Sequence, residues 1–158
     1  MLLAVLLTLT APAHATDGPP ATPAAVAPDP ARWLAGYDTL RLALVEDDSA
    51  AAAAAAPAMA TAADGAAELA AAASRVASAS DVAEMRTAFS ELSKLAIQRL
   101  SGAGSPRVLV YHCPMHVGFA YWVQPKAGIA NPYMGRAMPE CGEEVSLKAA
   151  VKAAAGPG

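Results

Sequence analysis

The side chains that can bind a metal ion are concentrated in the last third of this chain. Both cysteines, two of the three histidines and half of the six methionines lie there. These residues are His112, Cys113, Met115, His116, Met134, Met138 and Cys141. Thiolate, thioether and imidazole groups are the ligands that soft ions such as Cu(I) and Ag(I) select, whereas hard cations prefer carboxylate cages. The residue types therefore predict a soft-metal site, with copper as the first candidate and silver as the second.

The spacing of these residues indicates how the chain would assemble the site. Cys113 and Met115 lie two residues apart with a proline between them. Met134, Met138 and Cys141 follow at intervals of four and three, which places them on one face if the loop makes a helical turn. We expect this loop to fold back on the earlier motif. Paired C-x-x-C motifs are absent from the sequence, so a structural zinc site is disfavoured. The expected ligands are Cys113, Met115, His116, Met138 and Cys141, with His112 and Met134 as weaker candidates.

Other roles for the same residues stay open. A bond between Cys113 and Cys141 would close a loop of 28 residues. Such a disulfide typically stabilises a fold by about 2–4 kcal/mol and is common in exported proteins. Met134 and Met138 also fit the role of gap-fillers in a core, and His112 that of an ordinary surface residue. A reversible disulfide and a metal site are compatible, because both use the same thiols.

The N-terminus predicts export. An apolar run over residues 1–9 is followed by Ala13-His14-Ala15, a pattern typical of a cleaved signal peptide. We expect residues 1–15 to be that signal peptide and residues 16–28, rich in proline and alanine, to be a flexible linker. The expected location is periplasmic, with no membrane insertion once the signal is removed. A net charge of -3 without a basic stripe argues against a nucleic-acid partner.

Hydrophobic periodicity predicts the elements that must position the site. Asp29 and Pro30 begin a helix that ends near residue 46, and apolar residues recur on one of its faces. An alanine-rich helix begins near residue 50, with a kink or break expected at Pro57 and at residues 64–65, and helix resuming over 66–76. A third amphipathic helix follows the Asp81 cap and ends near residue 100.

Beyond residue 107 the period changes from about 3.6 to 2, which is typical of strands. We expect a β-hairpin over residues 107–123, an ordered Cys/Met loop over 124–142 and a third short strand over 143–147. The predicted fold is mainly α, a bundle of three or four helices with a small C-terminal β-hairpin or sheet. It forms a single domain over residues 29–148, followed by a frayed tail over 149–158.

These motifs also resemble those of a known family. The run from Tyr111 to His116, together with Asn131-Pro132-Tyr133 and Cys141-Gly142-Glu143, resembles an uncharacterised periplasmic "domain of unknown function" family. Its members occur alone or fused to the C-terminus of copper/silver efflux membrane-fusion (adaptor) proteins. The resemblance spans about residues 33 to 147. It extends to residues of the helical part: Tyr37, Leu40, Leu44, Val45, Asp47, Asp48, Arg86, Phe89, Leu92 and Ser93.

The resemblance implies a role in heavy-metal handling, with Cys113, Met115, Met138 and Cys141 as ligands and an efflux adaptor or envelope protein as partner. The Cys-Pro-Met-His string also resembles a short heavy-metal-binding motif of copper-transport proteins, in which a proline usually follows the histidine. Here Val117 follows it.

The sequence does not indicate an enzyme. It shows no Ser/His/Asp arrangement, no glycine-rich phosphate cradle and no C-x-x-C redox pair. We therefore expect a non-enzymatic soft-metal module associated with efflux or metal homeostasis. The alternative is a docking module, stapled by a Cys113–Cys141 disulfide, for an efflux or envelope partner.

Overall fold

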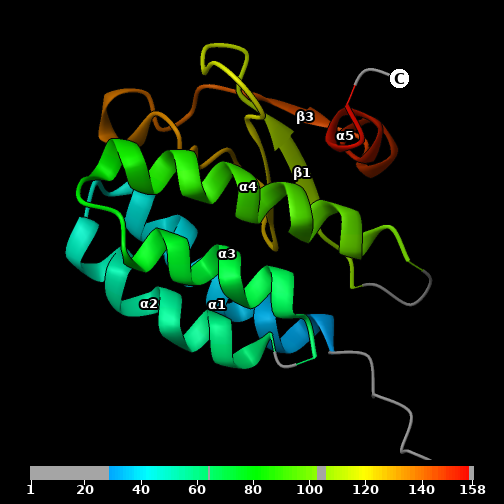
Figure 1. The fold of residues 1–158 in the computed structure, drawn as a ribbon. Helices are drawn as coiled ribbons and strands as arrows, with labels where there is room; N and C mark the ends of the chain where they lie inside the picture. The colour runs from blue at the N-terminus through cyan, green and yellow to red at the C-terminus, as the bar shows by residue number, and fades with distance from the viewer. Residues whose placement is uncertain (1–28, 64, 103–105, 157–158) are drawn as a thin grey trace, which may run out of the picture.

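The computed structural model describes residues 29–63, 65–102 and 106–156, which form a helical bundle joined to a small antiparallel sheet. The elements are α1 (Pro30–Val45), α2 (Ser49–Ala62), α3 (Ala67–Ala77), α4 (Val82–Leu100), β1 (Leu109–His112), β2 (Tyr121–Gln124), the short 3-10 helix η1 (Gly135–Ala137), β3 (Glu143–Val145) and α5 (Leu147–Ala154). In Figure 1, α4 runs between α3 and the sheet, and α5 lies beside the sheet. The predicted fold class, mainly helical with a small C-terminal sheet, is confirmed.

The predicted signal peptide (1–15) and linker (16–28) lie outside the described residues. Within the part of the chain that the structure describes, no helix combines the length and apolar character needed to cross a membrane.

Aspartates at three helix starts explain where these helices begin. The carboxylates of Asp29, Asp48 and Asp81 each accept a hydrogen bond from a backbone N–H two or three residues further on, at 2.8–3.0 Å. Without such a cap the first N–H groups of a helix lack partners, and losing one typically costs about 1 kcal/mol. Asp29 and Asp81 are the caps expected from the sequence, and Asp48 has the same role at the start of α2.

The alanine-rich region differs in one detail from the prediction. α2 ends at Ala62 and α3 begins at Ala67, whereas Pro57 lies inside α2 without ending it. Pro57 is exposed, so its ring faces solvent and its missing N–H removes a single helical hydrogen bond. Small residues let α1 and α2 approach closely, because a Cβ at Gly36 would lie only 2.8 Å from the Cα of Met59.

The sheet has the strand order β2-β1-β3, with both neighbouring pairs antiparallel. Tyr111 pairs with Trp122 on one side and with Glu144 on the other. His112 pairs with Tyr121 and Glu143. Cys113 follows the end of β1, and Cys141 lies two residues before β3, so the sheet topology places both cysteines at the same end of the sheet.

The C-terminus was predicted wrongly as a frayed tail from residue 149. It forms α5, whose N-cap Ser146 accepts a hydrogen bond from the Ala149 N–H at 3.2 Å. Ala150 and Ala154 are buried as α5 packs on α4, and Gln98 donates to the Ala154 carbonyl. Alanine side chains alone give a weak hydrophobic pattern, and this docking supplies the stability that the pattern did not predict.

A row of aromatic rings joins the helical bundle to the sheet. Tyr37 on α1 lies 5.1 Å from Phe89 on α4, centroid to centroid, and Phe89 lies 5.8 Å from Tyr133 in the Cys/Met loop. Tyr133 in turn meets Trp122 of β2 edge-on at 6.1 Å. All four rings are buried, so the loop that carries Cys141 packs on the same core as the helices.

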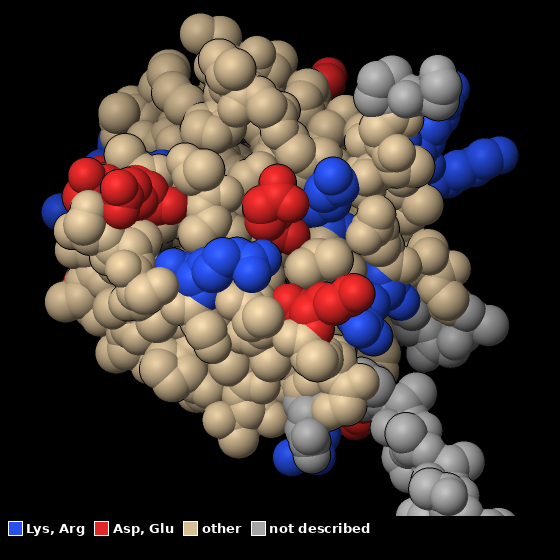
Figure 2. Space-filling view, viewed as in Figure 1, with Lys and Arg blue, Asp and Glu red and all other residues tan. Residues whose placement is uncertain are grey.

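The outer face of α3 and α4 carries charges of both signs (Figure 2). Glu68 and Arg75 of α3 line a shallow depression together with Glu91 and Lys94 of α4. A mixed-charge surface of this kind is typical of helices that face solvent.

Candidate metal centre

The two cysteines face each other across the end of the sheet. The Cys113 and Cys141 sulfurs lie 4.0 Å apart, and both thiols are free. Cys113 has an exposed fraction of 0%, whereas Cys141 is half-buried. One sulfur therefore belongs to the core and the other borders the solvent, an arrangement in which an ion could reach the pair from the Cys141 side.

Cys113 is held by the hairpin. Its backbone N–H donates to the Ala120 carbonyl at 3.0 Å, which extends the β1–β2 pairing past His112. This hydrogen bond closes the Cys-Pro-Met-His segment into a loop between the two strands. Cys113 is therefore fixed by regular sheet structure.

Cys141 is held by loop contacts. Its N–H donates to the Met138 carbonyl at 3.2 Å, and its own carbonyl accepts from the side-chain amide of Asn131 at 2.5 Å. Gly142 follows with φ +153, and a Cβ there would meet the Trp122 ring at 2.9 Å. The Gly142 backbone therefore packs directly against the Trp122 ring, and this contact fixes the position of the residue next to Cys141.

The distance between the sulfurs decides what the pair can do as it stands. A disulfide bond is about 2.05 Å long, so the pair is open in this structure. With metal–sulfur bonds of about 2.3 Å, two thiolates lie about 4.0 Å apart at a trigonal angle and about 3.8 Å apart at a tetrahedral angle. The observed 4.0 Å therefore fits two thiolates that share one ion.

The environment of Cys141 favours the protonated form of its thiol. Burial raises the pKa of Cys141 above its ordinary 9.0, and the hydrogen bond and charge of Cys113 raise it further. Both effects of Cys113 favour a protonated neighbour. A metal ion at this pair must therefore displace a proton from Cys141.

His116 lies over the aromatic row. Its ring stacks on Tyr133 with centroids 4.8 Å apart, and the Tyr133 hydroxyl donates to the Tyr121 carbonyl at 2.8 Å. Burial lowers the pKa of His116 below its ordinary 6.5, and the positive charge of Arg86 lowers it further. His116 is consequently neutral at pH 7, which is the form in which an imidazole binds metal.

His112 is engaged on the surface of the sheet instead. Its ring stacks on Tyr121 at 4.4 Å, and its Nδ1 lies 3.3 Å from the Glu143 carboxylate. These partners come from the two neighbouring strands. His112 thus makes the contacts of a cross-strand surface residue, one of the roles left open by the sequence.

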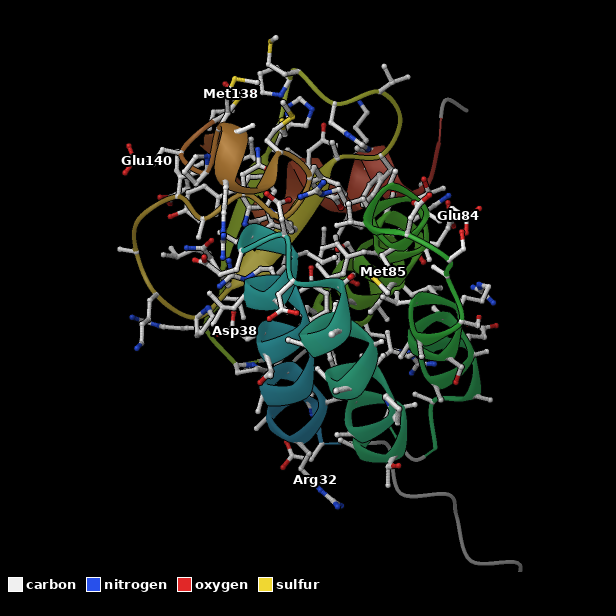
Figure 3. The ribbon with its side chains drawn as sticks, turned by 90° about the vertical axis from the view of Figure 1, so that its left-hand side faces the viewer. Arg32, Asp38, Glu84, Met85, Met138 and Glu140 are labelled. Carbon is white, nitrogen blue, oxygen red and sulfur yellow. The ribbon has the colours of Figure 1, made fainter. Side chains whose placement is uncertain are left out.

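The methionines differ in exposure. Met115 is 63% exposed and Met138 39%, whereas Met134 is partly buried against the core. Figure 3 shows Met138 at the outer surface of the loop. The expected helical turn is present only as the three residues of η1, so Met134 and Met138 do not continue a common helical face. Met134 fits the gap-filling role that the sequence left open.

The ligand inventory is small. Among the described residues, no group of three or more His, Cys, Asp and Glu side chains is placed to hold a metal ion. The structure brings two thiols together, and a further ligand would have to be a thioether or imidazole of the surrounding loops. Two or three soft ligands are a set that suits Cu(I) and Ag(I) better than a hard cation.

Sequence reasoning assigned no role to Arg41, although it is 3% exposed. It donates to the Ala130 carbonyl at 2.8 Å and to Asp38. Position 41 lies among the apolar positions 37, 40 and 44 of the predicted helix, so a charged residue on that face was the available signal. Arg86 and Asn131 were noted for their resemblance only, without a structural role.

The comparisons with known proteins concern mainly the helical part. Residues 34–107 match a family model described as Protein of unknown function (DUF3347). The matched range covers most of α1 and all of α2, α3 and α4, and it ends before β1 and the candidate ligands. This part of the chain therefore matches an uncharacterised domain of unknown function. No curated protein and no solved structure matches the chain.

Proposed function

We propose that this chain is an exported module that binds a soft metal ion, Cu(I) first and Ag(I) second, through the thiolates of Cys113 and Cys141. The observation that carries the proposal is the open thiol pair, with its sulfurs 4.0 Å apart. Two thiolates bound to one ion need about this separation. The pair also matches the softness of the ion, because thiolates select Cu(I) over hard cations.

The two loops that carry the cysteines also contain the remaining ligand types. Met115 and Met138 expose their side chains on the two loops that carry the cysteines, and His116 is neutral at pH 7. We propose that these three residues complete the coordination when an ion is bound. His112 and Met134 have other contacts and are left outside the ligand set.

The cellular role follows from the sequence features. A signal-like N-terminus and the resemblance to modules of copper/silver efflux adaptors support a periplasmic location and a task in efflux or metal homeostasis. The module would buffer the ion or transfer it to an efflux adaptor or envelope protein. We propose no catalysis, since the thiols are separated in sequence and no nucleophile–base pair was found in it.

Anaerobic titration of the reduced protein with Cu(I), against a competing chelator, tests the proposal. We expect one ion per chain, and we expect the double variant Cys113→Ser/Cys141→Ser to lose binding. Met115→Leu/Met138→Leu should weaken binding, whereas the matched variant Met85→Leu, at a buried position on α4, should leave it unchanged. Binding that survives loss of both cysteines would refute the proposal.

A second function is supported by the same pair. Free thiols this close can be joined by oxidation, and the product would staple the hairpin to the Cys/Met loop. In that case the chain is a docking module for an efflux or envelope partner. Thermal unfolding with and without reductant separates the two, because a staple predicts a lower Tm after reduction and a Cu(I) affinity no greater than that of the cysteine-free variant.

A further inference from the structure

The position of Cys141 depends on a loop, and the contacts of that loop converge on one side chain. Asn131 is fully buried, with an exposed fraction of 0%. Its Nδ2 donates to the Cys141 carbonyl at 2.5 Å. Its Oδ1 accepts from the N–H groups of Tyr133 at 2.8 Å and Met134 at 3.2 Å. The amide thus connects the turn that follows it to the residue that carries the second thiol.

The backbone of Asn131 makes the same connection. Its N–H donates to the Pro139 carbonyl at 2.7 Å, and its carbonyl accepts from the Gly135 N–H at 3.3 Å. Backbone and side chain together tie the beginning of the 131–141 loop to its end. Because Cys141 precedes the short strand β3, these hydrogen bonds fix where the thiol enters the sheet.

Two helices hold the carbonyls on either side of Asn131. Arg41 of α1 donates to the Ala130 carbonyl at 2.8 Å, and Arg86 of α4 donates to the Pro132 carbonyl at 2.8 Å. Each guanidinium is oriented by a carboxylate, Asp38 for Arg41 and Asp47 for Arg86. Arginine suits this task because its planar group offers several donors in fixed directions.

We propose that Asn131 is the positioning residue of the thiol pair, and that Arg41 and Arg86 make the helical bundle the support for it. The contacts run from α1 and α4 to the carbonyls of residues 130 and 132, through the Asn131 amide, to the Cys141 carbonyl. This inference rests on the proposed function only for what the thiol pair is used for. Its physical content is that these residues determine the effective concentration of one thiol at the other.

Thiol–disulfide exchange measures that quantity without any metal. The reduced protein reacts with oxidised glutathione: one S–S bond forms between the two cysteines and the S–S bond of glutathione breaks. The two electrons and two protons that the protein thiols lose convert the glutathione disulfide into two reduced glutathione molecules. The equilibrium constant reports the effective concentration of one thiol at the other. The protein is equilibrated in buffers of known glutathione ratio, and the remaining thiols are then alkylated. Mass spectrometry of the products gives the ratio of reduced to oxidised protein, and from it the equilibrium constant.

The informative variant is Asn131→Asp. A carboxylate keeps the acceptor for Tyr133 and Met134 but has no N–H to donate to Cys141. We expect the equilibrium constant to fall about tenfold, the effect of one lost hydrogen bond to a buried carbonyl. Gln124→Glu is the matched control, because Gln124 is a buried amide that donates to the Lys126 and Gly128 carbonyls and makes no contact with the 131–141 loop among its hydrogen bonds.

The two variants separate positioning from general destabilisation. Positioning predicts a fall in Asn131→Asp and a change of less than about twofold in Gln124→Glu. An unchanged constant in Asn131→Asp, or an equal fall in both variants, overturns the inference. If Asn131→Asp does not fold, Arg86→Lys replaces it as the test. Lysine keeps the positive charge beside Asp47 but lacks the forked donors of the guanidinium. An unchanged equilibrium constant in Arg86→Lys would also overturn the inference.

The outcome is independent of copper. A chain that binds no Cu(I) and still shows the Asn131-dependent equilibrium refutes the proposed function and leaves the positioning role intact. If the Cys113/Cys141 site binds Cu(I) tightly and the exchange constant is insensitive to Asn131→Asp, the proposed function is supported and the positioning role is refuted.

Discussion

Arg86 of α4 and Asp47, in the turn between α1 and α2, form an ion pair against which residues 131–136 pack. Arg86 also donates to the carbonyls of Pro132 and Leu44, and the Asp47 carboxylate accepts from the Arg136 N–H at 3.0 Å. The hydrogen bond from Arg86 lowers the pKa of Asp47, with a further contribution from the Arg136 N–H. One pair thus joins two helices to the loop that carries Cys141.

We expect Arg86→Ala to destabilise the fold by about 1–3 kcal/mol, because it leaves the Pro132 carbonyl without its Arg86 donor and the partly exposed Asp47 without its counter-charge. The matched variant is Arg136→Ala, whose side chain pairs with Glu46 while both are exposed to solvent. Surface pairs of this kind contribute about 0–1 kcal/mol. Urea unfolding measures both. Equal losses in the two variants would show that Arg86 does not have the structural role assigned to it.

The backbone of Gly135 packs closely against the Arg86–Asp47 ion pair. It has φ +56, and a Cβ there would lie 2.1 Å from Asp47 Oδ1 and 2.2 Å from Arg86 Nη2. We expect Gly135→Ala to displace the loop, to cost more than about 2 kcal/mol and to lower Cu(I) affinity. Gly128→Ala is the control, since Gly128 also has positive φ but has open space around its Cβ position. Its cost should be only the strain of about 1 kcal/mol. A Gly135→Ala variant as stable as Gly128→Ala would contradict the packing described.

The helices were predictable because their signals are local. Asp29, Asp48 and Asp81 each cap the helix that begins at the next residue. The apolar residues within these helices recur over several turns. The hairpin was predictable for the same reason, since alternation and turn residues lie within one short segment. Local signals failed at α5, where alanines are buried against α4, a helix distant in the chain.

The site was predictable in residue type but not in geometry. Soft ligands could be recognised from composition, and the structure brings Cys141 to Cys113 as the expected fold-back requires. The hydrogen bond from Arg41 to the Ala130 carbonyl spans 89 residues, and no pattern within one sequence specifies such a pair. For the same reason the sequence could not tell that His112 is paired on the sheet while His116 lies on Tyr133.

Cu(I) affinity should rise with pH. Both thiols must be thiolates when the ion is bound, and the pKa of Cys141 is raised above 9.0 by burial and by Cys113. Below that value each increase in pH removes part of the proton competition, so affinity increases through neutral pH and levels off only above 9. Competition titrations between pH 6 and 9 measure the slope. Cys141→Ser should give weaker binding and a shallower slope, and a pH-independent affinity would exclude Cys141 as a ligand.

The two histidines offer the sharpest comparison of ligand and non-ligand. Burial and Arg86 lower the pKa of His116, so the imidazole keeps a free lone pair at pH 7. The His116 ring, in the loop between β1 and β2, lies on Tyr133 of the Cys/Met loop. His112 instead pairs with Glu143 and stacks on Tyr121. We expect His116→Ala to lower Cu(I) affinity about tenfold and His112→Ala to leave it within about twofold, as for loss of one ligand against loss of none. Nitrogen coordination to the metal should disappear from the X-ray absorption spectrum of the His116 variant alone. Equal affinities for the two variants would restrict the site to sulfur, with His116 acting only as a cover over the aromatic row.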